Sequence, residues 1–107
     1  MKLVIAIVNR DDANAVTQGL TKNGFYSTKL ASSGGFLLAG NITLLIGVQE
    51  EKVSQVIEII REHSHSRKQM IPATNEIGMN YMSSMPVEVT VGGATVFVVD
   101  VEHFERL

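Results

Sequence analysis

Apolar and polar positions alternate along much of this chain, and their parity separates a core face from a free face. Residues 2–8 are apolar at both parities, as in a central strand that is buried on both sides. In the segment 41–48 the even-numbered positions are all apolar, whereas Asn41, Thr43 and Gly47 occupy the opposite face beside one leucine. We expect the even face to pack in the core and the odd face to be free to meet a planar ligand.

Two segments carry apolar residues with the period of a helix. Residues 13–22 follow Asp11 and Asp12, a pair that can cap a helix and suits its positive N-terminus, and Gly24 is a natural C-terminal stop. Residues 50–62 place an apolar stripe opposite charged and polar side chains. We therefore expect two amphipathic helices.

The remaining segments complete the order of elements. Strand-like alternation recurs in residues 25–30, 87–91 and 94–101. The connection 63–85 shows no sustained period but allows a short strand near 69–72, and 103–107 forms a tail with helical potential. The order is β-α-β-β-α-β with an extra strand in the long loop before the last strand, which predicts a ferredoxin-like α+β sandwich. The second apolar face of its sheet indicates a homo-oligomer.

Composition limits the classes of function. We expect one domain over residues 1–107, with 45% hydrophobic and 19% charged residues, as is ordinary for a folded protein. A net charge of −2 argues against a general DNA or RNA binder, because binding to the phosphate backbone rests on clustered cations. The chain has no cysteine, no apolar run of about 20 residues and no signal-peptide pattern. These features predict a cytoplasmic protein without disulfides or membrane segments.

Catalytic and metal chemistry find little support in the sequence. His63 and His65 beside Glu62 resemble a metal-ligand group, but spacing fixes no further ligand, and such residues also suit a helix end. The serines lie in no nucleophile elbow, and the paired carboxylates fall at predicted helix starts. We expect no enzyme, no cofactor and no metal site.

The turn 32–35 and the residue after it form the first candidate for binding. Unhindered N–H groups in its Ser-Ser-Gly-Gly run can form an anion-binding concavity, and Phe36 offers a face on which a base can stack with about 1–3 kcal/mol. If the flanking strands pair, four of their residues meet near the turn: Tyr26, Thr28, Asn41 and Gly47. The alternative is an ordinary hairpin whose glycines satisfy the turn torsions.

Two separated motifs carry a family resemblance. The string Thr-Lys-Leu-Ala-x-x-Gly-Gly-Phe-Leu-x-x-Gly-Asn-x-Thr, over residues 28–43, looks like the signature of the PII-like cyclic-di-AMP receptors of Firmicutes. Residues 1–8, residues 86–98 and the surroundings of Arg67 resemble that family as well. The resemblance implies a PII-like homotrimer without known catalytic activity, which binds cyclic-di-AMP in clefts between subunits. Its downstream protein partner is not identified by the chain.

The resemblance also implies which residues meet the ligand. Residues that match the family's ligand contacts, together with residues that replace such contacts, form the expected ligand set: Tyr26, Thr28, Gly35, Phe36, Leu37, Asn41, Gly47 and Arg106. Gly24 and Tyr26 stand where the family has Asn and Arg, and Arg106 stands where it has Gln. Losing one hydrogen bond to a charged group weakens binding about 10- to 150-fold. Stacking by Tyr26 and the charge of Arg106 can offset part of that loss.

Other interpretations stay open. The departures at Gly24 and Tyr26 favour a divergent interaction scaffold that has lost nucleotide binding or reads another nucleotide such as ATP. A metal-binding trimer is conceivable from the fold alone. Arg67, where the family also has an arginine, either is solvated or approaches a ligand phosphate from the neighbouring subunit.

Overall fold

The computed structural model describes residues 1–30, 40–72 and 86–107. Its elements follow in this order: β1 Lys2–Asn9, α1 Arg10–Lys22, β2 Thr28–Leu30, β3 Asn41–Val48, the 3-10 helix η2 Glu50–Lys52, α2 Val53–Ser64, β4 Arg67–Pro72, β5 Pro86–Val91 and β6 Ala94–Asp100. The predicted turn 32–35 and Phe36 lie outside the described residues.

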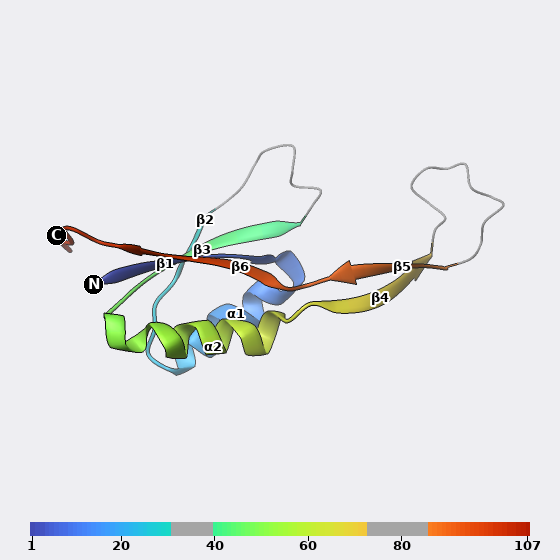
Figure 1. Cartoon of the computed structure of the whole chain (residues 1–107), viewed down its shortest axis with the longest axis horizontal. Coiled ribbons are helices and arrows are strands. Elements are labelled where there is room, and N and C mark those ends of the chain that lie inside the picture. Colours follow the sequence, from blue (N-terminus) through green and yellow to red (C-terminus); the bar gives the residue numbers. More distant parts are fainter. Residues whose placement is uncertain (31–39, 73–85) are drawn as a thin grey trace.

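Four strands form one antiparallel sheet, and both helices lie on one face of it (Figure 1). The strand order is β2-β3-β1-β6, so β1 occupies a central position. The helix α1 links β1 to β2, whereas α2 and the inserted strands β4 and β5 link β3 to β6. This arrangement is the predicted ferredoxin-like α+β sandwich, and the fold prediction is confirmed.

The core lies between the helices and the even-numbered face of the sheet. Val4 and Ala6 of β1 are fully buried, as are Leu44 and Ile46 of β3, so the parity of β3 is as predicted. Both helices add their apolar stripes to this core: Val16, Leu20, Val56 and Ile60. Burial of one such side chain contributes about 1.5–3 kcal/mol. Neither helix in the described part of the chain has the length and apolarity needed to cross a bilayer.

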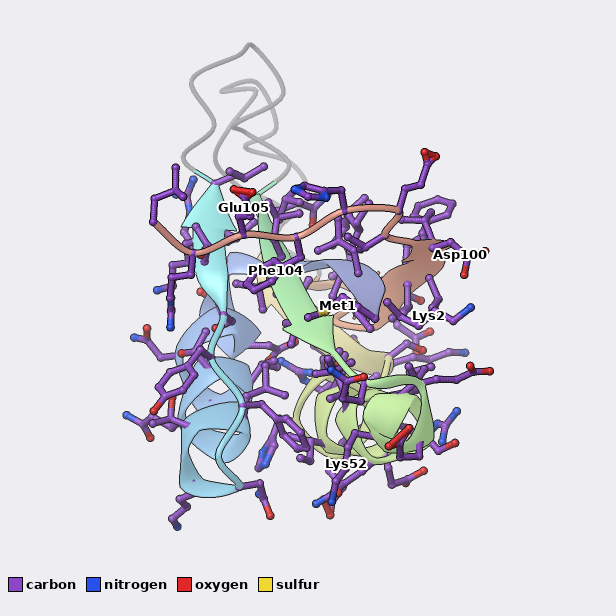
Figure 2. All side chains as sticks on the ribbon, turned by 90° about the vertical axis from the view of Figure 1, so that its left-hand side faces the viewer. Met1, Lys2, Lys52, Asp100, Phe104 and Glu105 are labelled. Carbon is purple, nitrogen blue, oxygen red and sulfur yellow. The ribbon has the colours of Figure 1, made fainter. Side chains whose placement is uncertain are left out.

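The opposite face of the sheet carries a second set of apolar side chains. We call it the outer face; its apolar members are the half-buried Leu3, Ile5, Ile7 and Leu45 and the exposed Phe97 and Val99. Among the described elements no helix covers this face, and the tail after β6 crosses only one end of it (Figures 1 and 2). The apolar face expected from the pattern of β1 is therefore present.

The strands β4 and β5 pair only with each other and form a separate two-stranded ribbon. It projects away from the sandwich along the long axis of the molecule (Figure 1). The radius of gyration is 17.1 Å, against about 13 Å for a compact domain of about 100 residues. Gly92 and Gly93, with φ of 81° and 84°, connect the ribbon directly to β6. The predicted extra strand thus belongs to a projecting ribbon and not to the main sheet.

Three local predictions were wrong. The cap of α1 is Asn9 and not the aspartate pair, because the Asn9 side chain accepts a hydrogen bond from the Asp11 amide at 2.8 Å. Strand β2 has three residues, since Phe25 turns into the core and removes the preceding segment from the sheet. The tail 103–107 forms no helix.

Candidate functional site

A cavity of about 490 Å³ opens on the outer face, where the ends of β1 and β3 meet the segment before β2 and the tail after β6. Nine described residues line it: Met1, Leu3, Tyr26, Thr28, Leu45, Gly47, Val101, Phe104 and Arg106. Ligand pockets commonly measure about 300–1,000 Å³ and combine an apolar lining with a few polar groups. The size and chemistry of this cavity suit a small organic ligand.

Strand pairing explains why residues distant in sequence meet here. Thr28 of β2 lies opposite Leu45 of β3, and Gly47 lies opposite Leu3 of β1, so all four residues share the outer face. Tyr26 has the same parity as Thr28 and lines the same cavity, with 78% of its surface exposed. The sheet therefore presents an exposed ring, a hydroxyl and a bare backbone position side by side.

Gly47 leaves open space at the cavity wall. A Cβ atom added there would have Met1 Sδ as its nearest neighbour, at the ordinary contact distance of 3.8 Å. The backbone at Gly47 has no positive φ, so neither torsion nor crowding requires glycine. Glycine at this position therefore leaves the strand backbone open toward the cavity.

The C-terminal tail closes one side of the cavity. The amide of Val101 donates a hydrogen bond to the Met1 carbonyl at 3.2 Å, which continues the pairing of β6 with β1 for one more residue. The chain then crosses the end of the sheet toward β2 (Figure 2). Phe104 and Arg106 of this tail line the same cavity as Tyr26 and Thr28.

An ion pair holds the strand ends from which the tail departs. Lys2 of β1 and Asp100 of β6 are register partners, and their side chains form a hydrogen-bonded salt bridge. The hydrogen bond from Lys2, together with its charge, lowers the pKa of Asp100, and the same hydrogen bond raises the pKa of Lys2. The Asp100 side chain is exposed and that of Lys2 is half-buried, so this pair contributes little to stability.

The structure brings part of the predicted ligand set together. Tyr26, Thr28, Gly47 and Arg106 line one cavity. Asn41 does not line it, because it begins β3 at the opposite end of the strand, paired with Asn9. Three predicted residues lie outside the described part of the chain: Gly35, Phe36 and Leu37.

Several lining residues were missed from the sequence. Leu45 was noted only as an apolar exception on a polar face, and the cavity wall explains its presence there. Phe104 was missed because the tail has no period and its path over the sheet depends on tertiary contacts. Its spacing of two from Arg106 is the one signal that could have placed both side chains on the same side of an extended tail.

The other charged candidates lie elsewhere. Arg67 pairs with Asp12 of its own chain, with 3.0 Å between Nη2 and Oδ1, and does not line the cavity. The His63 ring packs beside Gly19, where an added Cβ would lie 2.9 Å from Nε2. No group of three potential metal ligands occurs among the described residues.

Comparison with known proteins identifies a family and a similar fold. The family model for the cyclic-di-AMP receptor matches residues 1–107. The fold is similar to the crystal structure of a functionally unknown protein from Pediococcus pentosaceus ATCC 25745, with a TM-score of 0.75 and 43% sequence identity over 99% of this chain and 96% of that chain. With the family match spanning its whole length, the chain belongs to the cyclic-di-AMP receptor family.

Proposed function

We propose that this protein is a non-enzymatic, homotrimeric signalling receptor that binds cyclic-di-AMP in clefts between its subunits. One observation carries the proposal. Four residues of the expected ligand set, drawn from three distant parts of the chain, line a single cavity on the outer face: Thr28 and Gly47, which match the family pattern, and Tyr26 and Arg106, which replace its residues. The family match over residues 1–107 supports cyclic-di-AMP as the ligand. As this ligand is a cytoplasmic second messenger, the protein acts in the cytoplasm and passes the signal to a protein not yet identified.

The cavity offers the groups that a cyclic dinucleotide requires. The Arg106 guanidinium can form paired, charge-assisted hydrogen bonds to a phosphodiester. Tyr26 and Phe104 provide aromatic faces, and stacking on such a face is worth about 1–3 kcal/mol per base. The bare backbone at Gly47 admits a planar base at close range, with the Thr28 hydroxyl beside it. Asn41, Gly35, Phe36 and Leu37 remain predicted contacts from the family pattern.

The chemistry of the lining favours binding over catalysis. Its nine described residues include no carboxylate and no imidazole side chain that could serve as a general base. They provide cationic, aromatic and hydroxyl groups, which can hold a ligand without transforming it. This composition supports a receptor.

The outer face supports assembly of several subunits. Phe97 and Val99 are exposed there, beside the half-buried apolar row of β1. Apolar surface of this kind usually meets a partner. The cavity opens on the same face, so a neighbouring subunit packed on that face would complete its wall. The number of three subunits rests on the family resemblance.

Calorimetric titration with cyclic-di-AMP, ATP and cyclic-di-GMP tests the proposal. We expect saturable binding of cyclic-di-AMP near one ligand per subunit. Arg106→Ala should weaken this binding about 10- to 150-fold, because one charged hydrogen bond is lost. It should also reduce the salt dependence of binding. Arg61→Ala, at an exposed arginine of α2 remote from the cavity, is the matched control. Absence of heat and an unchanged melting temperature would overturn the proposal, whereas selective ATP binding would reassign the ligand.

A further inference from the structure

Asp12 is the one charged side chain that is buried among the described residues, and the cavity makes no use of it. It lies in the first turn of α1. Its two carboxylate oxygens accept hydrogen bonds from the Arg67 guanidinium, at 3.0 Å from Nη2 and 3.4 Å from Nη1. Arg67 is the first residue of β4. A two-point ion pair therefore joins the helix layer to the base of the projecting ribbon.

The Arg67 side chain, which is 40% exposed, has two further neighbours. Nη1 also donates to the carbonyl of His65 at 3.2 Å. A Cβ atom added at Gly92 would lie only 2.5 Å from Nη1 and 2.8 Å from that carbonyl. Gly92 thus leaves the space in which the guanidinium lies, and its φ of 81° turns the chain from β5 into β6. The ion pair consequently fixes both strands of the ribbon where they leave the sandwich.

The same turn of α1 contacts a second segment. The amide of Arg10 donates a hydrogen bond to the carbonyl of Gly40, and Asn9, which caps the helix, is the register partner of Asn41. Gly40 directly follows the part of the sequence that carries Phe36 and Leu37, two predicted ligand contacts. One helical turn therefore touches the end of the predicted ligand-binding segment and the base of the ribbon.

We propose that the first turn of α1 couples Gly40, which directly precedes β3, to the β4–β5 ribbon, through the Arg10–Gly40 hydrogen bond and the Asp12–Arg67 ion pair. A helical turn moves as a rigid unit, so a displacement of Gly40 changes the position of the Asp12 carboxylate and with it the direction of the ribbon. Coupling between two sites is reciprocal, so a change at the ribbon base must also reach Gly40. The ligand-driven form of this coupling rests on the proposed function, whereas the coupling in the free protein does not.

Hydrogen exchange of single amides in the free protein tests the coupling. In Arg67→Gln the Arg10 amide should exchange faster by about fivefold or more, the lower range of typical coupling between sites. Exchange is compared with that of central β1 amides, which report global unfolding. Arg61→Gln, which removes an exposed arginine paired with Glu58 within α2, is the matched control. If the ratio of the Arg10 exchange rate to that of the β1 amides is the same in Arg67→Gln as in the wild type, the proposal is overturned.

The reciprocal variant is Gly40→Ala. Gly40 has φ of 70°, and no atom of the described residues lies within 4 Å of an added Cβ, so alanine there strains the backbone. This variant should speed hydrogen exchange of the amides that pair β4 with β5. The same substitution should have no such effect in a chain that already carries Arg67→Gln. Additive effects of the two substitutions would also contradict the coupling.

A final experiment, with cyclic-di-AMP present, distinguishes failure of the coupling from failure of the proposed function. Cyclic-di-AMP should alter ribbon exchange in the wild type, and Arg67→Gln should still bind the nucleotide by calorimetry while losing this response. A full ribbon response in Arg67→Gln overturns the coupling. Failure of the wild type to bind overturns only the proposed function, because the measurements on the free protein still decide the coupling.

Discussion

At the scale of single residues, Gly47 illustrates how a missing side chain can serve a site. Its neighbours leave room for a Cβ atom, and its backbone has no positive φ, so the fold itself accepts a larger residue. The value of glycine at this position lies in the space it leaves in the cavity. A substitution there should therefore separate ligand binding from stability.

We expect Gly47→Val to weaken binding of cyclic-di-AMP about tenfold or more, because overpacking costs about 1–3 kcal/mol. The urea midpoint of unfolding should stay close to that of the wild type, since β-branched residues suit strands. Titration calorimetry and urea denaturation measure the two effects. Thr95→Val, on the outer face of β6 and away from the cavity, is the control. If Gly47→Val binds cyclic-di-AMP with wild-type affinity, Gly47 does not contact the ligand.

At the scale of elements, parity along the strands was the most informative signal. The even face of β3 packs in the core, as the alternation predicted, and Leu45 and Gly47 of its odd face line the cavity. The course of the chain could not be predicted from the sequence where it depends on tertiary contacts. The inward turn of Phe25 shortens β2, and the tail that carries Phe104 has no period of its own. The pairing of β4 with β5 spans a segment whose sequence lacks a sustained pattern.

The junction between ribbon and sheet gives a prediction at the same scale. Gly92→Ala should destabilise the protein more than Gly24→Ala, because both glycines have positive φ but only Gly92 is crowded. An added Cβ at Gly24 meets no atom within 4 Å, so its substitution reports the torsional cost alone, about 1–3 kcal/mol. Urea denaturation of the two variants gives the difference. Equal losses of stability would show that the Arg67 guanidinium moves aside freely.

At the scale of the whole molecule, the sandwich has one face protected by helices and one apolar face exposed. The proposed assembly covers this second face and closes the cavity with a neighbouring subunit. Assembly and ligand binding would then use the same surface, so each should strengthen the other.

Phe97→Lys should break the assembly while leaving the subunit folded. Phe97 is 52% exposed in the isolated chain, so its replacement removes little from the core, but a buried charge in an interface is costly. Light scattering coupled to size exclusion should show a fall from the mass of three chains to that of one. Gln55→Lys adds the same charge on the exposed side of α2 and should leave the mass unchanged. An unaltered mass in Phe97→Lys would place the interface elsewhere.

The place of β1 between β3 and β6 has a consequence for biosynthesis. Lys2 pairs with Asp100, 98 residues later, so one edge of β1 stays without its partner until β6 has been made. Translation proceeds at about 5–20 residues per second, and pairing over such a separation in sequence is slow to form. The nascent chain therefore carries an unpaired edge of an apolar strand until β6 has left the ribosome, and its yield in cells should depend on chaperones that shield such edges.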